Sequence, residues 1–549
     1  MPIDDGFDVK FLPGVPPAEA GCPPPHPRVE HVDGMVIEYD ASVPMRDGIE
    51  IYADVYRPGG DEPVPVIVAW GPYGKHAPVK YDLFPDHGVA AEWVSRHAGF
   101  EAPDPLYWTR HGYAVINADP RGMWNSPGDA TFYSAQEARD VYDLIEWAGT
   151  RLWSTGKVGM SGVSYLAITQ WRVAAEHPPH LAAINPWEGL SDRYREMSYH
   201  GGIPEDRFGP MWRTRRVPYS TGRVEDTVTM YAEHPLFDAY WESKTPDLDS
   251  VRVPAFVVAS WSDQGLHTRG TIEGFRRIGS EHKWLLVHGR KKWQFYYQPE
   301  NVELLREFFD RFLRGQSTGV DSWPRVRVEV RERFYVGHGL EGRNWPLTGT
   351  DYRRLYLDAS TGQLSGTAGG AEAEVRYDAK TGRAEFGHRF AADTDLVGPM
   401  WLRLWVQSDG SDDMDLFVAV QKLDQAGEIV PFSFFNSLQD GPVALGWLRA
   451  SHRERDDTRS SPGQPWHPHR REQRLAPDEV VAVDIEIWPS GTRFRAGEEL
   501  RLIIQGRDIY TYPPGVVNVG HSQTRNRGDH IIHAGGRYNS HLVIPVVST

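Results

Sequence analysis

The sequence predicts an α/β fold that carries an inserted helical segment and a C-terminal β domain. Short apolar runs alternate with helix-length segments over residues 64–187 and again over 251–320. Residues 188–250 break this rhythm with short aromatic stretches punctuated by Gly and Pro. Beyond residue 320 the helical pattern disappears, and apolar and polar residues alternate with period two. Alternating strands and helices indicate a parallel sheet, whereas many short alternating strands indicate a sandwich or jelly roll.

These changes of pattern divide the 549 residues into five segments. The first is rich in proline and is expected to form an extended arm without regular structure. A hairpin with an Asp-Gly turn is predicted next, over residues 35–58. The predicted boundaries are 1–33 for the arm, 34–187 and 251–320 for the two parts of the α/β core, 188–250 for the helical cap and 321–549 for the C-terminal jelly roll.

Within the α/β core, buried parallel strands are expected to alternate with amphipathic helices. The apolar runs are short and bounded by turn residues, as in strands that are covered on both faces. One helix carries a capping box, with Ser134 as its N-cap and Glu137 three residues later. Strands are predicted at 64–70, 113–119, 157–162, 181–186, 253–263 and 283–289, and helices at 134–150, 164–178, 267–279 and 299–315.

Composition and charge exclude several classes of function. The net charge of −16 disfavours nucleic acid and anionic membranes as partners, and short basic clusters such as GRKKW (289–293) are interpreted as solvated faces. A single cysteine, Cys22, excludes an internal disulfide and a cysteine-based zinc site. The scattered histidines show no metal-ligand spacing, so no metal or other cofactor is expected. Without a secretory signal or a membrane-spanning run, the protein is expected to be cytoplasmic; a homo-oligomer remains open.

The stretch KVGMSGVSYLAITQW (157–171) contains two candidate nucleophiles. A nucleophile elbow needs a strand, a sharp turn that carries the serine, and then a helix. Ser161 would place Gly162 and a β-branched valine in the first helical turn, which is unfavourable. Ser164 leaves a full strand before it and is followed by good helix-forming sequence, while Gly162 supplies an unhindered residue for the turn. The pattern therefore favours Ser164.

A serine nucleophile needs a base and a group that orients the base. Asp263 closes one predicted strand and His288 closes the next, so both follow Ser164 in the order typical of α/β-hydrolases. All three lie at carboxyl ends of strands, where open α/β sheets bind ligands. For the oxyanion, the N–H of Tyr165 is one candidate donor, and the hydroxyl of Tyr73 in the loop AWGPYGK is another.

Several motifs resemble one known family. The motifs GVSY, GPYGK and RDGIEIYADVYRP are similar to those of cocaine esterase and X-prolyl dipeptidyl peptidase, a family that also includes α-amino-acid ester hydrolases and glutaryl-cephalosporin acylases. The resemblance runs from about residue 35 to the C-terminus. It implies an α/β-hydrolase core, an inserted helical cap and a C-terminal jelly roll. It also implies that Ser164 is the nucleophile, Asp263 the acid and Tyr73 the oxyanion donor.

The histidine departs from the family pattern. The usual motif G-P-W-x-H, laid on Gly289, places Trp293 where the histidine should be. His288, one residue before that glycine, is the preferred candidate for the base. His267, four residues after Asp263, is the second candidate, and another histidine remains open.

The predicted function is that of a serine hydrolase that cleaves an ester or amide of a small organic acid through an acyl-enzyme on Ser164. Arg121 is interpreted as a structural ion-pair residue. One alternative is an X-prolyl dipeptidyl aminopeptidase or α-amino-acid ester hydrolase, which needs acidic groups for the substrate amine; a second is a catalytically altered relative with a binding role. Candidate pocket aromatics are Trp187, Trp261, Trp212 and Phe208, with core packing equally consistent for the first two, and acidic residues of the cap include Glu188, Asp192, Glu196, Glu205 and Asp206.

Overall fold

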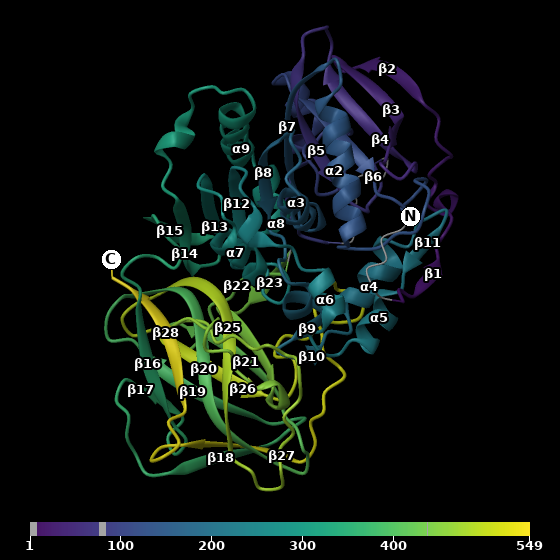
Figure 1. Ribbon diagram of the computed structural model, residues 1–549. Coiled ribbons are helices and arrows are strands. Elements are labelled where there is room, and N and C mark those ends of the chain that lie inside the picture. Colours follow the sequence, from purple (N-terminus) through teal and green to yellow (C-terminus); the bar gives the residue numbers. More distant parts are fainter. Residues whose placement is uncertain (1–7, 76–83, 436, 549) are drawn as a thin grey trace.

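A long mixed sheet organises the first 340 residues. The computed structural model describes residues 8–75, 84–435 and 437–548, and Figure 1 shows this sheet above the C-terminal strands. Neighbouring strands from β6 to β14 are parallel, and antiparallel strands flank them on both sides. The order is β2 (Arg28–Val32), β3 (Met35–Pro44), β4 (Glu50–Pro58), β6 (Ala114–Asp119), β5 (Val64–Trp70), β7 (Ser154–Val163), β8 (Leu181–Trp187), β12 (Ala255–Ser260), β13 (Lys283–His288), β14 (Val326–Arg333) and β15 (Val336–Gly342).

Helices cover both faces of this sheet, because its central strands are apolar on both sides. In β5, Val66 and Val68 pack in the same core as Leu144, whereas Ile67 points to the opposite face and packs in the core that contains Phe308. The first core is covered by α2 (Ala135–Gly149), α3 (Tyr165–Ala175) and α7 (Thr268–Arg277), and the second by α1 (Pro105–Arg110), α8 (Lys292–Tyr297) and α9 (Pro299–Leu313). The strands and helices predicted for the α/β core are therefore confirmed.

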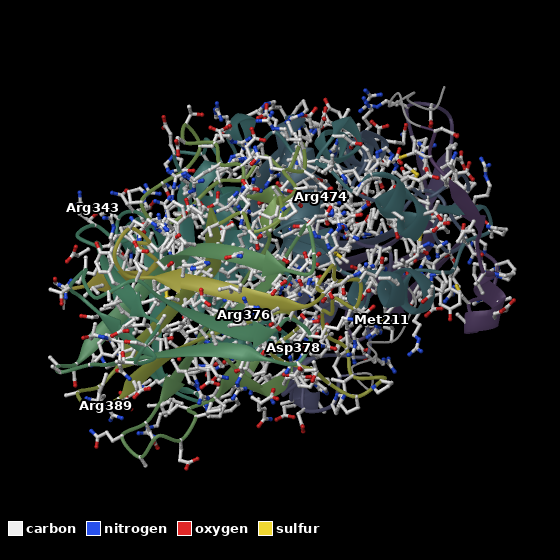
Figure 2. The ribbon with its side chains drawn as sticks, turned by 90° about the horizontal axis from the view of Figure 1, so that it is seen from below. Met211, Arg343, Arg376, Asp378, Arg389 and Arg474 are labelled. Carbon is white, nitrogen blue, oxygen red and sulfur yellow. The ribbon has the colours of Figure 1, made fainter. Side chains whose placement is uncertain are left out.

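The segment predicted as a helical cap contains only short helices. They are η4 (Tyr194–Ser198), α4 (Phe208–Met211), η5 (Trp212–Arg216), α5 (Thr227–Glu233), α6 (Ala239–Ser243) and η6 (Leu248–Ser250), with strands β9 (Tyr199–His200), β10 (Ile203–Pro204) and β11 (Arg223–Glu225). Figure 1 places α4, α5 and α6 beside the C-terminal strands, and Figure 2 labels Met211 at the end of α4.

The N-terminal arm is more regular than predicted. Strand β1 (Phe11–Pro13) pairs antiparallel with β11 of the cap, and β2 pairs with β3 of the main sheet. A 3-10 turn, η1, covers Pro17–Ala20. The prediction of an arm without regular structure is thus wrong for these stretches, because the backbone of a proline-rich segment can still pair at a sheet edge. Residues 1–7 of the predicted arm lie outside the described residues.

The C-terminal strands form a mainly antiparallel unit with its own core, which meets the main sheet where Arg331 of β14 pairs with Thr492. The longest, β20 (Thr394–Asp409), pairs with β25 (Val481–Phe494), β27 (Asp529–Ala534) and β28 (His541–Val547). Inward residues such as Leu402, Ile485 and Leu502 form its apolar core. Arg376, which is labelled in Figure 2, pairs with Asp409 at 2.7 Å, and both side chains are exposed. The remaining strands are β16 (Asp351–Asp358), β17 (Gln363–Ser365), β18 (Ala373–Asp378), β19 (Arg383–Arg389), β21 (Asp415–Leu423), β22 (Phe432–Phe434), β23 (Leu438–Gly441), β24 (Ala444–Arg449) and β26 (Glu499–Gln505).

Candidate active site

Ser164 lies on a sharp turn between β7 and α3. Its backbone has φ 60° and ψ −116°, a conformation that few residues other than glycine adopt. Gly162 permits the close approach, because a Cβ there would lie 2.5 Å from the Cβ of Leu166. Ser161, the rejected candidate, is fully buried, and its hydroxyl donates to Asn185 at 2.9 Å. The turn therefore presents Ser164 in the way that a nucleophile elbow requires.

The imidazole that faces Ser164 belongs to His267. Its Nε2 lies 3.2 Å from the Ser164 hydroxyl oxygen, and its Nδ1 makes a short hydrogen bond with the carboxylate of Asp263. A carboxylate only accepts, so Nδ1 carries the proton and Nε2 is free to accept from the serine. The N–H groups of Leu266, His267 and Thr268 all donate to the Asp263 carbonyl at 3.2 Å, which folds the chain back so that residues 263 and 267 meet.

His288, the preferred candidate from the sequence, lies away from the serine. Its Nε2 donates to Glu188 Oε1 at 3.0 Å, and its Nδ1 accepts from the N–H of Arg290 at 3.1 Å. The ring of Phe295 stacks on it with centroids 3.8 Å apart. Both ring nitrogens of His288 are therefore occupied, and neither of their partners is Ser164. The prediction of His288 as the base is wrong, although His288 ends β13, which lies beside the strand that leads to Asp263.

Lys292 is a part of this cluster that the sequence did not reveal. Its ammonium lies 2.6 Å from Asp263 Oδ2 and 3.0 Å from His267 Nδ1, and its side chain is 2% exposed. Burial and the charge of Lys292 hold the pKa of His267 below its usual value, against the opposing effect of Asp263. The cluster GRKKW was interpreted as a solvated face, and this is wrong for Lys291 and Lys292, because both are buried.

Glu101 is a second buried ionisable residue that the sequence did not reveal. Its backbone has φ 63°, and its carbonyl accepts from the N–H of Val163, directly before the nucleophile. The indole of Trp293 donates to its Oε1 at 2.9 Å. Burial raises the pKa of the Glu101 carboxyl to about 7, although Lys292 opposes this shift. Neither Lys292 nor Glu101 belongs to a catalytic motif of the sequence, so only the fold brings these two residues to the elbow.

The two predicted oxyanion donors belong to tyrosines whose rings are in contact. Tyr165 is the first residue of α3, so its N–H has no acceptor within the helix. The ring of Tyr73 packs edge-on against that of Tyr165, with centroids 6.5 Å apart. Burial raises the pKa of the Tyr73 phenol well above its usual value, so the hydroxyl keeps a proton to donate. It also accepts a long hydrogen bond, 3.4 Å, from the indole of Trp212.

The four aromatic residues predicted to line a pocket have different surroundings. Trp187 is fully buried and packs at 5.0 Å against Tyr296 in the core behind the sheet. Trp261 donates to the Glu329 carbonyl at 2.7 Å and is also fully buried. Core packing explains both positions. Trp212 reaches the Tyr73 hydroxyl, and Phe208 of α4 packs against Phe435 with centroids 5.6 Å apart.

The five acidic residues of the cap singled out from the sequence are engaged with other groups of the protein. Arg121, as predicted, is a structural residue that pairs with Asp140 at 2.7 Å and Asp47 at 2.9 Å. The five acidic side chains bind as follows: Glu188 with His288 and Ser260, Asp192 with Arg195, Glu196 with Arg269 and the N–H of Ser191, Glu205 with the N–H groups of residues 207–209, and Asp206 with Ser522. None of them is left over for a substrate amine.

The described residues contain neither a metal-binding cluster nor a membrane-spanning helix. No group of three or more His, Cys, Asp or Glu side chains is placed to hold a metal ion in the described part of the chain. No helix among the described residues has both the length and the apolar character needed to cross a membrane.

Comparison with known proteins decides the family. Residues 47–223 match the model of the X-Pro dipeptidyl-peptidase (S15) family, and residues 318–543 match the model of the X-Pro dipeptidyl-peptidase C-terminal non-catalytic domain. A crystal structure of a CocE/NonD family hydrolase from Staphylococcus aureus is 42% identical, covers 94% of both chains and superposes with a TM-score of 0.91. The chain belongs to the CocE/NonD family of hydrolases. It is therefore an enzyme with an α/β-hydrolase fold and an additional C-terminal domain.

More distant members of the family are also similar. Cocaine esterase from Rhodococcus sp. (strain MB1 Bresler) is 29% identical over 399 residues, which are 62% of this chain. The aligned part spans 65% of the length of that esterase. The structure of an α-amino acid ester hydrolase covers the whole of both chains with a TM-score of 0.71, and at 16% identity it shows the fold alone. The family model, the cocaine esterase and the CocE/NonD hydrolase structure support a serine hydrolase of the CocE/NonD family.

Proposed function

We propose that this CocE/NonD hydrolase cleaves an ester or amide of a small organic acid through an acyl-enzyme on Ser164. The observation that carries the proposal is the chain of contacts from Ser164 through His267 to Asp263. The base is thus the second histidine candidate from the sequence. The two parts of the α/β core would carry the chemistry, and the C-terminal unit, for which a jelly roll is proposed, would support it.

In the proposed reaction, Ser164 attacks the acyl carbon while its proton moves to His267 Nε2. The negative oxygen that forms would be held by the Tyr165 N–H and the Tyr73 hydroxyl. The proton on His267 then passes to the leaving alcohol or amine as the old bond breaks, which leaves the acyl group on the serine. A water molecule attacks next, gives its proton to His267, and releases the acid while Ser164 recovers its proton.

The low pKa of His267 suits this role, because a base must be unprotonated before it can accept the serine proton. Asp263, whose pKa is lowered by the charges of Lys292 and His267 despite its burial, stays ionised and stabilises the imidazolium that forms.

The alternatives lose support. An X-prolyl peptidase or an α-amino-acid ester hydrolase needs a free acidic group for the substrate amine, and the five cap acids singled out from the sequence are engaged with other groups. The idea of a catalytically altered relative rested on the missing G-P-W-x-H motif, which the position of His267 accounts for. A matched pair of substrates, one with a free α-amine and one N-acylated, tests the first alternative: equal or better turnover of the N-acyl form supports the proposal.

A fluorophosphonate that labels reactive serines tests the proposal without a known substrate. We expect wild-type protein to be labelled, Ser164→Ala not at all, and His267→Gln more slowly by at least a hundredfold, since base catalysis typically contributes 10²–10⁴-fold. His282→Gln is the control, because that histidine is exposed. Labelling of the Ser164→Ala protein at Ser161, or unchanged labelling of His267→Gln, would refute the proposed triad.

A further inference from the structure

Arg193 is a buried cation without a counterion. It follows β8 in the cap, and only 1% of it is exposed. None of its three guanidinium nitrogens donates a hydrogen bond within 3.5 Å to any described residue, and it forms no ion pair within that part of the chain. Buried charges in proteins are normally paired, because removing an ion from water is costly. An arginine in this state calls for an acceptor that the chain does not supply.

Aromatic rings pack on Arg193 but leave its donors open. The guanidinium carbon lies 4.6 Å from the ring centre of Tyr133, 5.4 Å from that of Tyr231 and 5.7 Å from that of Trp212. Such contacts stabilise the charge through the faces of the rings. The five N–H groups, however, lie in the plane of the guanidinium and still need acceptors.

Two hydroxyl groups beside Arg193 are also unsatisfied. Neither the Tyr231 hydroxyl nor the Ser198 hydroxyl has a hydrogen-bond partner within 3.5 Å among the described residues, although both oxygens are buried. Burial raises the pKa of Tyr231 to about 12, and the charge of Arg193 and weak hydrogen bonds with Arg193 and Ser198 oppose that shift, which places the three groups together. Three convergent polar groups with no closer partner than one another are rare in a folded interior.

A cavity adjoins the hydroxyl-bearing side of this cluster, and Arg193 packs on the ring of Tyr231 from outside the cavity lining. The cavity has a volume of about 120 Å³, and Ser198 and Tyr231 are among its lining residues. At ~30 Å³ for each water molecule, that volume holds about four waters, or a small charged group with part of the chain that carries it. Glu205 and Asp206 also line the cavity, but their oxygens already accept from the N–H groups of Phe208 and Ser522.

We infer that Arg193, Ser198 and Tyr231 form a binding site for a carboxylate. The planar guanidinium matches a carboxylate with two parallel hydrogen bonds, and the two hydroxyls can donate to the same group. One indole separates this site from the proposed oxyanion donor, since Trp212 packs on Arg193 and reaches the Tyr73 hydroxyl. The carboxylate comes either from the far end of the acyl substrate or from a free small acid; the first source rests on the proposed function.

The substrate source is tested with 4-nitrophenyl monoadipate and 4-nitrophenyl hexanoate, which have acyl chains of equal length and differ in the terminal carboxylate. We expect wild-type kcat/KM to favour the adipate ester, and Arg193→Met to lower the adipate-to-hexanoate ratio at least tenfold while hexanoate turnover stays within twofold. Tyr231→Phe should lower the same ratio by a smaller factor. Tyr199→Phe is the control, since its hydroxyl lines the same cavity region but donates to the Tyr231 carbonyl at 2.7 Å.

The free-acid source is tested by the melting temperature in sodium acetate against sodium chloride at equal ionic strength. Stabilisation of the wild type by acetate that disappears in Arg193→Met and weakens in Tyr231→Phe supports this source, even if the adipate ratio does not change. An unchanged ratio together with no acetate effect overturns the inference. Absence of turnover of both esters would instead contradict the proposed function, and the acetate measurement would still decide the carboxylate site.

Discussion

Replacing Lys292 with methionine should raise the pH at which the enzyme loses activity on the acidic side. The ammonium of Lys292 lies 3.0 Å from His267 Nδ1, and the charge of an imidazolium is spread over its ring, so the two charges are roughly 4 Å apart. At an effective dielectric constant of about 20, such a pair repels by about 4 kcal/mol, or about three pKa units. Methionine keeps the apolar stem and removes the charge.

The expected shift is smaller than that limit, because the substitution loosens the pocket and Asp263 loses one donor. We expect the acid limb, the part of the pH profile in which activity falls toward low pH, to move to higher pH by about one to two units. The sign follows from the charge: without the ammonium, the imidazolium is less disfavoured, the pKa of His267 rises, and a higher pH is needed to keep the base unprotonated. In the wild type, the acid limb should lie below the ordinary histidine pKa of about 6.5.

The assay is the rate of inactivation by a fluorophosphonate from about pH 4 to 9, which reports the ionisation of the free enzyme. Lys291→Met is the matched control, since its ammonium is also buried but donates to the Asp86 carbonyl at 2.6 Å. Groups that act on His267 from neighbouring elements are Asp263, Lys292 and Glu188, and only Lys292 changes here. An acid limb that stays in place or moves to lower pH in Lys292→Met would refute the reasoning.

Three further substitutions separate catalytic from structural roles. Tyr73→Phe should lower kcat by about 10²-fold, the usual cost of one oxyanion donor, with an unchanged melting temperature. A Gly162→Ala substitution should abolish fluorophosphonate labelling, because its Cβ would lie 2.5 Å from that of Leu166 and distort the turn; normal labelling would contradict a tight elbow. Arg121→Met should lower the melting temperature, because it leaves Asp140 buried without its 2.7 Å partner, yet the labelling rate of the folded protein should match the wild type.

The sequence was sufficient to predict the core strands and the position of the elbow serine, because local patterns encode both. The alternation of apolar runs with amphipathic helices marks β5, β6 and β7 in order, and Ser164 is the serine that leaves a whole strand before it and a good helix after it. Asp263 follows from the same logic, since it comes shortly after β12 at the carboxyl edge of the sheet.

The base could not be predicted in this way. His288 ends β13 at the same edge as Asp263, so a rule based on strand ends favours it. The choice depends on a turn instead: Gly265, with φ 89°, lets the chain fold back and bring His267 to the serine. The burial of Lys292 could not be predicted either, because a short basic run is usually solvated. Only the tertiary fold shows that the ammonium of Lys292 pairs with Asp263.

One turn thus fixes both the acid and the base of the proposed triad. The Asp263 carbonyl holds the backbone of residues 266–268, while its carboxylate holds the imidazole of His267, so the geometry of this pair does not depend on another loop. The loop after β13, where the usual family motif carries its histidine, is then free to contribute Lys292 to the same carboxylate. The missing G-P-W-x-H motif therefore marks a rearranged site, in which a cation near the base lowers its pKa, rather than a lost one.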